Sequence, residues 1–554
     1  MRRLLFLIVA SLTVLTAGAQ VLSVEGPRTR VPQYGRADFD IVLQGRWNNP
    51  YLQEEVKLDM VLTTPSGRTL TLPCFYVEGE SGGESRWAAR FTPQEKGRYS
   101  YALHYAERGI PFIEVSDDFV ELPPPGGVFE VGDPLGHGIL HVNDNWTLRF
   151  DDGTLFRGVG ENICWESRTH DDSKFFSALH ERHDKYNYDV MLPQFAAAGG
   201  NFCRLWMCSW NFPIDRHRNF NNFRYKESDE YFNPSAVARL DHTVELGENL
   251  GIRFMLCMGA GDVRTDRDFF VSPAAKARYR NYLRYIVARW GYSPAIGMWE
   301  FFNEIDNIQF RDERNPIPAA DIVAWHAEMA AYLKSIDPFG HIVTTSISHR
   351  DLEGLNDVKD MDINQKHIYR ATSAIPGTIV QYEKAHGKPY VIGEFSYEWD
   401  WSKNFDDFGE DMDLDFKRGL WYGLFSPTPV TPMSWWWEYF ENRGMVSYFR
   451  NVRYVNDRML KYGKGAFESV GIEAHGADAF AVRCGKRVYV YVFNSTEHYV
   501  TGISVSMEGR RHKCRPYDFD KARFRGGMGN KGQNGTLFIP VKMPPRSEML
   551  YEIK

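Results

Sequence analysis

The chain has 554 residues, more than one hydrophobic core usually supports, so two or three domains are expected. Its formal net charge is -7, its pI is near 6.2, and it has no long basic run, which argues against nucleic acid as a partner. Aromatic residues make up 15% of the chain, with 15 Trp. This surplus favours rings that line a cleft as well as rings that fill β-rich cores.

The N-terminus has the pattern of a secretory signal peptide, residues 1–19. Two arginines precede an apolar core that runs from Leu4 to about Leu15, and the small residues Ala17, Gly18 and Ala19 follow. The apolar core is too short to span a bilayer, and cleavage is expected after Ala19. No later segment approaches transmembrane length. The sequence therefore predicts a secreted or periplasmic protein without membrane insertion.

The seven cysteines are an odd number, so at least one thiol stays free. Four of them, Cys164, Cys203, Cys208 and Cys257, lie within or beside apolar runs, and no CxxC pair occurs. This pattern favours small buried apolar side chains over a disulfide framework or a zinc site. No metal is expected.

The polar and apolar pattern changes twice along the chain. Short alternating runs broken by turn signals predict an N-terminal β-sandwich over 20–122. The proline- and glycine-rich segment Glu121–Gly127 predicts a stiff linker, taken as 123–136. The alternating pattern returns after Tyr462 and predicts a C-terminal β-sandwich over 464–554.

Between these regions, over 137–463, apolar runs alternate with stretches of helical period. Such alternation is typical of βα units, and eight units in about 300 residues fit a (β/α)8 barrel of the α/β class. One helix candidate has Pro234 and Ser235 at its start and Gly251 at its end. The eight candidate strands are 155–165, 201–208, 252–258, 296–304, 341–348, 363–369, 390–395 and 432–438.

Two glutamates stand where chemistry is expected in such a barrel, at the C-terminal ends of apolar strands. Glu304 ends the fourth candidate strand, and Glu394 ends the seventh. Hydrolysis of a glycoside with retention needs two carboxyl groups about 5 Å apart, one protonated and one ionised. A lone glutamate of this kind is often a solvated acid on a loop, but two at the tips of apolar strands favour a catalytic pair.

The sequences Asn303-Glu304 and Gly393-Glu394-Phe395 resemble the signatures of clan A retaining glycoside hydrolases, the group that includes families 2 and 5. The resemblance, termed family 5-like, covers the barrel, somewhat over half of the chain, and is specific for the clan but not for a family within it. It implies that Glu304 is the general acid/base, that Glu394 is the nucleophile, and that Asn303 binds the 2-hydroxyl of the sugar.

Further positions agree with the same resemblance. Arg204 on the second strand is similar to the clan arginine that supports the nucleophile, and His367 and Tyr369 on the sixth strand resemble its His-x-Tyr pair. The run Trp435 to Trp437 resembles the strand that carries the sugar platform. Neighbours on a regular strand point to opposite faces, so the run leaves both Trp435 and Trp436 as candidates for substrate binding.

Two more tryptophans, Trp165 near the end of the first candidate strand and Trp206 near the end of the second, are candidates for stacking on sugar rings. A buried ring is the ordinary alternative for each of them.

The residues also suggest how the two carboxyl groups divide the work. A cationic Arg204 close to Glu394 is expected to lower the pKa of Glu394 and keep it ionised. Apolar neighbours such as Trp299 or Phe302 are expected to raise the pKa of Glu304 by desolvation.

The sequence thus predicts a secreted retaining β-glycoside hydrolase that acts on β-linked oligo- or polysaccharide and needs no cofactor. One alternative is a carbohydrate-binding protein on a weak or inactive barrel. Another is a metal-dependent barrel lyase or isomerase, which would need a cluster of carboxylates at the strand ends. The sugar, the choice between exo and endo action and the oligomeric state stay open.

Overall fold

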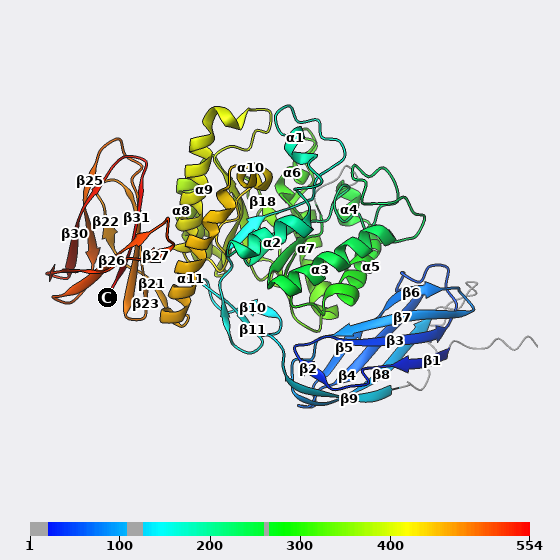
Figure 1. The fold of residues 1–554 in the computed structure, drawn as a ribbon. Helices are drawn as coiled ribbons and strands as arrows, with labels where there is room; N and C mark the ends of the chain where they lie inside the picture. Colours follow the sequence, from blue (N-terminus) through cyan, green and yellow to red (C-terminus); the bar gives the residue numbers. More distant parts are fainter. Residues whose placement is uncertain (1–19, 108–125, 260–264) are drawn as a thin grey trace, which may run out of the picture.

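The computed structural model describes residues 20–107, 126–259 and 265–554. The expected signal peptide, 1–19, lies outside the described residues. A central barrel lies between two β-domains, one from each end of the chain (Figure 1). Among the described residues, no helix combines the length and apolar character that crossing a bilayer requires.

Two sheets share one core in the N-terminal β-domain. The alternation expected from the sequence is visible in Ala37–Gln44, where every second side chain, such as Phe39 and Ile41, is buried. One sheet has the order β1 (Gln20–Glu25), β3 (Ala37–Gln44), β7 (Glu84–Phe91), β6 (Phe75–Gly79). The other has the order β2 (Val31–Gln33), β9 (Gly126–Pro134), β8 (Gly97–Glu107), β4 (Val56–Thr63), β5 (Thr69–Pro73).

The prediction of a linker over 123–136 is wrong from Gly126 onward. Residues Gly126–Pro134 form β9, which pairs with β8 on one side and with β2 on the other. Without β9, the inner edge of β8 would present a row of unpaired N–H and C=O groups. The N-terminal β-domain therefore extends to Pro134 rather than to Leu122.

The central domain is a parallel barrel. Its strands run β13 (Gly160–Asn162), β14 (Phe202–Trp206), β15 (Arg253–Cys257), β16 (Ile296–Glu300), β17 (Ile342–Thr344), β18 (Ser346–Ile347), β19 (Asn364–Tyr369) and β20 (Tyr390–Ser396). The β17 and β18 segments together occupy the fifth position, so seven positions coincide with the expected strands.

The eighth position is irregular. Val430 bridges to Gly158, and Ser434 bridges to both Glu161 and Phe395, which closes the barrel between its first and seventh strands. The expected strand over 432–438 is wrong after this point, because Trp436 has a φ of 71° and a helix follows at once. A left-handed residue cannot continue a β-strand.

A layer of helices surrounds the barrel (Figure 1). The helix α3 begins and ends as the sequence predicted: Asn233 caps Ser235 and Ala236, and Gly251 adopts the left-handed conformation. The main helices are α2 (Tyr188–Ala197), α3 (Pro234–Leu250), α5 (Pro273–Trp290), α7 (Ala319–Ile336), α8 (Ile375–His386), α9 (Gly409–Leu424) and α11 (Phe449–Gly463). Shorter helices are α1 (Ser177–His180), α4 (Arg267–Val271), α6 (Ile305–Gln309) and α10 (Trp437–Asn442).

A small antiparallel sheet closes the N-terminal end of the barrel. It comprises β10 (Leu140–Val142), β11 (Leu148–Phe150) and β12 (Leu155–Phe156), with β11 and β12 paired antiparallel. Its apolar side chains share a core with Phe202, Met255 and Met298 from the barrel strands. In the part of the chain that the structure describes, this end of the barrel is filled, so a ligand is expected to enter at the C-terminal ends of the strands.

The C-terminal β-domain also has two sheets around one core. The helix α11 ends at Gly463, close to the expected boundary. The first sheet contains β21 (Phe467–Ser469), β23 (Asp478–Cys484), β24 (Arg487–Phe493), β31 (Glu548–Ile553), β26 (His512–Asp518), β27 (Arg523–Phe524) and β28 (Met528–Asn530). The second contains β22 (Ile472–Glu473), β25 (Val500–Ser506), β30 (Thr536–Met543) and β29 (Gly532–Gln533).

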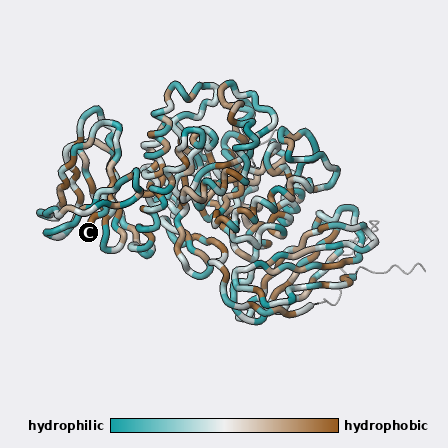
Figure 2. The backbone as a smooth tube through the Cα atoms, in the orientation of Figure 1, coloured by the Kyte–Doolittle hydropathy of each residue, from teal (hydrophilic) through white to brown (hydrophobic). Residues whose placement is uncertain are grey.

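Both β-domains dock on the barrel, where apolar segments converge (Figure 2). Arg284 of α5 donates to Asp59 of the N-terminal β-domain at 2.6 Å, and both side chains are buried. On the other side, Trp421 of α9 stacks on Tyr491 with ring centroids 5.5 Å apart.

All seven cysteines are buried free thiols.

Candidate active site

Glu304 and Glu394 come together at the C-terminal ends of the barrel strands. A carboxylate oxygen from each and a ring nitrogen of His367 all lie within 4.8 Å of one another. His367 Nδ1 is 2.8 Å from Glu304 Oε1 and 3.3 Å from Glu394 Oε2. This separation matches the roughly 5 Å between the carboxyl groups of a retaining pair.

Two donors fix the Glu394 carboxylate. Arg204 Nη1 donates to Oε1 at 2.6 Å, and the Tyr369 hydroxyl donates to Oε2 at 2.5 Å. The Glu394 side chain is only 4% exposed, so no rotation into solvent competes with this position. The arrangement orients one carboxylate rigidly toward the barrel mouth.

The surroundings of Glu304 are different. Its side chain is 19% exposed, and Asn307 Nδ2 donates to Oε2 at 2.7 Å. Its backbone φ is 48°, a left-handed conformation that is costly for a residue with a Cβ, and Ser346 Oγ accepts from its backbone N–H. The fourth strand, β16, already ends at Glu300, and Glu304 stands at the N-cap of α6, where this conformation aims its carboxyl group across the mouth toward Glu394.

Arg204 is shared between two carboxylates. It is completely buried, and it donates through Nε and Nη2 to Glu300, at 2.6 and 2.8 Å. Asn162 Oδ1 accepts from Nη1 at 3.3 Å, while the Asn162 amide donates to backbone carbonyls of the seventh and eighth positions. Sequence reasoning missed Glu300 and Asn162, although an acid inside the apolar run of the fourth strand was a visible signal.

Asn303 also contacts Arg204, with Oδ1 accepting from Nη2 at 2.8 Å. Because a guanidinium only donates, this contact fixes which way the Asn303 amide faces. Its Nδ2 therefore points away from Arg204, and no described residue accepts a hydrogen bond from it. Asn303 is placed to donate to a hydroxyl of a sugar.

The expected charge pattern is only partly correct. Burial raises the pKa of the Glu394 carboxyl, while His367, Arg204 and the Tyr369 hydroxyl oppose the rise. The expected net lowering is wrong, because dehydration of a fully enclosed carboxylate outweighs its donors. Although burial also acts against the charge on Arg204, Glu300 and Glu394 hold the Arg204 pKa well above its usual value.

The rings expected to desolvate Glu304 pack elsewhere. Trp299 lies against His341, with ring centroids 5.4 Å apart, and Phe302 lies against Trp325 of α7, at 5.4 Å. Alternation along β16 turns Trp299 away from the interior that Glu300 faces, and Phe302 lies beyond the end of this strand. The desolvation expected from them has no structural basis.

Three tryptophans form a cluster beside Arg204. The ring centroids of Trp165, Trp206 and Trp435 are 5.3 to 5.5 Å apart, and the Arg204 guanidinium lies over the Trp206 ring at 5.6 Å. Each ring is 9% exposed. The indole nitrogens of Trp165 and Trp206 are buried and have no hydrogen-bond partner among the described residues.

Trp436 meets this cluster only at Trp435, with ring centroids 6.5 Å apart, and its other ring contacts lie elsewhere. Its ring stacks on Phe176 and meets Phe405 edge to face, and its Nε1 donates to the Glu398 carbonyl at 2.7 Å. Trp436 was a candidate on the assumption that the strand is regular at this point. The left-handed φ of Trp436 shows that the strand is not regular here. Trp435 is the member of the pair that lies with Trp165 and Trp206.

Glu304, His367 and Glu394 also form the kind of ligand cluster that can hold a divalent cation. The sequence led us to expect no metal, and two members of this cluster are the expected catalytic glutamates. Arg204 and Tyr369 already occupy both oxygens of Glu394 as donors, however, which suits a free carboxylate better than a metal ligand.

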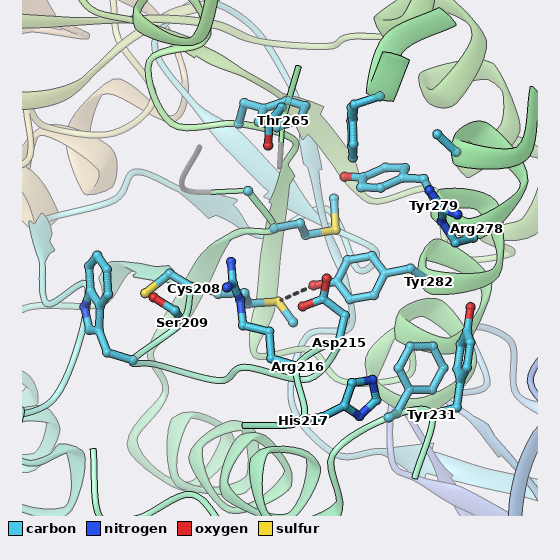
Figure 3. Close-up of a pocket in the computed structure, with 18 residues that line it drawn as sticks. Cys208, Ser209, Asp215, Arg216, His217, Tyr231, Thr265, Arg278, Tyr279 and Tyr282 are labelled. Carbon is cyan, nitrogen blue, oxygen red and sulfur yellow. Dashed lines mark hydrogen bonds between the residues drawn. The ribbon is translucent and has the colours of Figure 1, made fainter. Parts of the chain in front are cut away.

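A separate cavity of about 450 Å³ lies beside the catalytic face, between the ends of β14, β15 and β16 and the helix α5. Figure 3 shows Tyr279 and Tyr282 of α5 opposite Asp215 and Arg216 of the loop after β14. Neither catalytic candidate lines this cavity. It lies on the outer side of the strands that carry Arg204 and Asn303.

Comparison with known proteins agrees with this geometry. Residues 30–106 match the model of a domain of unknown function, DUF5060. A mannan endo-1,4-beta-mannosidase A of Podospora anserina is 24% identical over 38% of this chain and 65% of its own length. Two further mannan endo-1,4-beta-mannosidases from Aspergillus terreus and Emericella nidulans align over 30% and 57% of their lengths, so the chain spans less than two thirds of these relatives.

Solved structures show the same fold over most of the chain. A Bacteroides vulgatus protein described as a candidate glycoside hydrolase has a TM-score of 0.64 at 15% identity and covers 95% of this chain and all of that one. A glycoside hydrolase family 5 structure from the same species has a TM-score of 0.53 at 13% identity, covering 75% and 93% of the two chains. The chain therefore has the fold of these glycoside hydrolase structures, and part of it is similar in sequence to mannan endo-1,4-beta-mannosidases.

Proposed function

We propose that the protein is a retaining β-glycoside hydrolase that cleaves β-linked oligo- or polysaccharide by double displacement. The observation that carries the proposal is the pairing of Glu304 and Glu394 within 4.8 Å in unlike surroundings. One carboxylate is enclosed and held by two donors, and the other is partly exposed at the mouth. Two carboxyl groups in this arrangement supply a nucleophile and a proton donor.

In the first step, a Glu394 oxygen attacks the anomeric carbon while protonated Glu304 gives its proton to the leaving oxygen. The glycosidic bond breaks, and a glycosyl ester with Glu394 forms. Arg204 and Tyr369 hold the attacking carboxylate in place, so little reorganisation is needed. The Asn303 amide, turned away from Arg204, donates to the hydroxyl next to the anomeric carbon.

In the second step, Glu304 accepts a proton from water, and the resulting hydroxide attacks the same carbon and releases Glu394. Formation of the ester has removed the negative charge of Glu394 from the neighbourhood of Glu304. Loss of a nearby like charge favours the ionised form of Glu304, so the residue that was an acid becomes a base. Two inversions give net retention at the anomeric carbon.

The substrate we propose first is a β-1,4-linked mannan, because the curated relatives named above are mannan endo-1,4-beta-mannosidases. The indoles of Trp165, Trp206 and Trp435 lie together beside Arg204 and would supply apolar faces on which sugar rings stack. β-Glucosides, xylosides and galactosides are the competing substrates.

Residues 1–19 would direct export, and the two flanking two-sheet domains would act as β-sandwich scaffolds for the barrel.

The test is a screen of the purified protein on linear β-mannan, glucomannan, β-glucan, xylan and the matching aryl β-glycosides. We expect turnover of mannan in the wild type and a loss of about a thousandfold or more in Glu394→Gln and in Glu304→Gln. The Glu304 variant should keep more activity on an aryl glycoside, whose leaving group needs no proton. Wild-type rates in either variant would refute the assignment.

The main alternative is a carbohydrate-binding protein on an inactive barrel. It predicts measurable binding of oligosaccharide by the wild type without turnover of any substrate in the screen. A metal-dependent reaction would instead show activity that chelator removes and added divalent cation restores, for which the Glu304, His367 and Glu394 cluster would be the site.

A further inference from the structure

Two tryptophans next to the catalytic face are exposed, unlike the others. Trp399 is 52% exposed and Trp401 is 48% exposed, and the remaining 13 of the 15 tryptophans are buried or half-buried. Both lie on the loop that follows β20, the strand that carries Glu394. An exposed indole leaves a large apolar face in water and gains no packing energy unless a ligand covers it.

The loop that holds these rings is fixed at its base. Glu398 is 5% exposed and accepts from Arg370 Nε at 2.7 Å, from Lys403 Nζ at 2.5 Å and from the backbone N–H groups of Trp399 and Asp400. Although burial acts in the opposite direction, these donors hold the pKa of Glu398 at about 2. The two rings are therefore presented by an ordered loop.

One face of Trp399 is already covered by a cation. The Arg370 guanidinium lies over its ring, 5.0 Å from the centroid. Arg370 is held in turn by Glu398, and its backbone φ of 61° directs the chain sharply away from β19. Because an indole has two faces, this contact orients the ring and leaves the opposite face to solvent.

The loop that carries Trp399 and Trp401 begins close to the catalytic glutamate Glu394. Arg370 directly follows Tyr369 on β19, and Glu398 is four residues beyond Glu394 on the neighbouring strand. Tyr369 and Glu394 make their contact on the adjacent strands β19 and β20, and Arg370 and Glu398 make theirs just beyond the ends of the same strands. A glycan bound across Glu394 would leave the barrel over this side.

We infer that Trp399 and Trp401 form an outer sugar-binding platform, on which a pyranose ring of a β-linked glycan stacks beyond the sugars at the catalytic carboxylates. The inference rests on the proposed function and narrows the substrate class to chains long enough to reach from Glu394 to this loop. Short glycosides occupy the catalytic site without touching the platform.

The experiment compares β-1,4-mannotriose with β-1,4-mannohexaose as substrates of the wild type and of Trp399→Ala. We expect KM for the hexaose to rise about three- to tenfold in the variant, with kcat little changed, because a stacking contact is lost. KM and kcat for the triose should stay at wild-type values, which shows that Glu394 and Tyr369 are undisturbed. Trp401→Ala should change KM in the same direction.

The matched control is Tyr499→Ala. Tyr499 lies in the C-terminal β-domain, is 57% exposed and has the Lys542 amine over its ring at 5.6 Å, so it shares the exposure and the cationic contact of Trp399. We expect no change in KM for either substrate. An equal effect of the two alanine variants on the hexaose would overturn the platform.

A direct measurement of oligosaccharide binding distinguishes failure of the platform from failure of the proposed glycoside hydrolase function. If the wild type binds mannohexaose in calorimetry, Trp399→Ala should weaken that binding whether or not turnover occurs. Normal hydrolysis by the wild type with an unchanged KM for hexaose in Trp399→Ala would overturn the platform and leave the proposed function intact. Neither binding nor hydrolysis by the wild type would overturn both for β-mannan.

Discussion

Arg204 joins two buried carboxylates, donating to Glu300 through Nε and Nη2 and to Glu394 through Nη1, at distances of 2.6 to 2.8 Å. The guanidinium reaches both partners because its donors lie in one rigid plane. Glu300 thus holds the arginine that holds Glu394. Glu300 therefore influences the position of the nucleophile Glu394 through Arg204 and from a buried place that a substrate does not contact.

Replacing Arg204 with lysine should break this arrangement, since one ammonium group cannot serve Glu300 and Glu394 with the same geometry. We expect kcat/KM to fall about 10- to 100-fold, the effect of losing one hydrogen bond to a charged group. Steady-state kinetics on an aryl glycoside measures it. The control is Arg284→Lys, another buried arginine, which should leave kcat/KM unchanged.

Tyr369→Phe should move the acidic limb of the pH profile. Glu394 must be ionised to attack, its pKa is raised by burial, and the Tyr369 hydroxyl acts against that rise. Activity is therefore lost as pH falls through the Glu394 pKa, and removing the hydroxyl should shift that loss upward by about one pH unit. The profile of kcat/KM against pH reports the free enzyme. A downward shift would contradict the role given to Tyr369.

The contact between Asp59 and Arg284 should stabilise the docking of the N-terminal β-domain. Asp59→Ala leaves a buried arginine without its carboxylate, which typically costs about 3–5 kcal/mol. We expect a lower midpoint for the first thermal unfolding transition and unchanged kcat/KM at 25 °C. Arg28→Ala removes an exposed pair with Glu25 in the same domain and should shift the midpoint little.

The roles of Trp435 and Trp436 should separate on mutation. Trp435→Phe keeps an aromatic ring but reduces the stacking face beside Trp206, so KM should rise several-fold with little change in stability. Trp436→Phe removes the hydrogen bond to the Glu398 carbonyl and should lower stability by about 1 kcal/mol without changing KM for a short substrate. Kinetics and thermal unfolding of both variants test the distinction. The reverse pattern would place Trp436 at the sugar.

The barrel was predictable because its strands are short apolar runs separated by helices with clear caps, such as Asn233 and Gly251 around α3. The carboxylates were predictable because each ends such a run. Strand β9 was not, since Gly126 and Gly127 follow three prolines and resemble a linker until the unpaired edge of β8 is seen. Local composition does not show which edge needs a partner.

The site was predictable in its residue types but not in its contacts. Glu300 was overlooked because only the fold shows that it faces Arg204 rather than solvent. Trp436 was a candidate because a regular strand with alternating side chains was assumed. The left-handed φ of Trp436 itself interrupts the strand, so the assumption does not hold. The direction of the Glu394 pKa depended on how completely the folded chain encloses the carboxylate.

The central claim is that Glu394 forms a covalent bond to the sugar. The most direct measurement uses the 2-deoxy-2-fluoro glycosyl fluoride of the sugar that the wild type hydrolyses, followed by mass spectrometry of the intact protein and its peptides. We predict a mass increase of one fluorosugar, located on the peptide that contains Glu394 and absent in Glu394→Gln. Labelling at any other residue, or turnover of the reagent with inversion at the anomeric carbon, would contradict the mechanism.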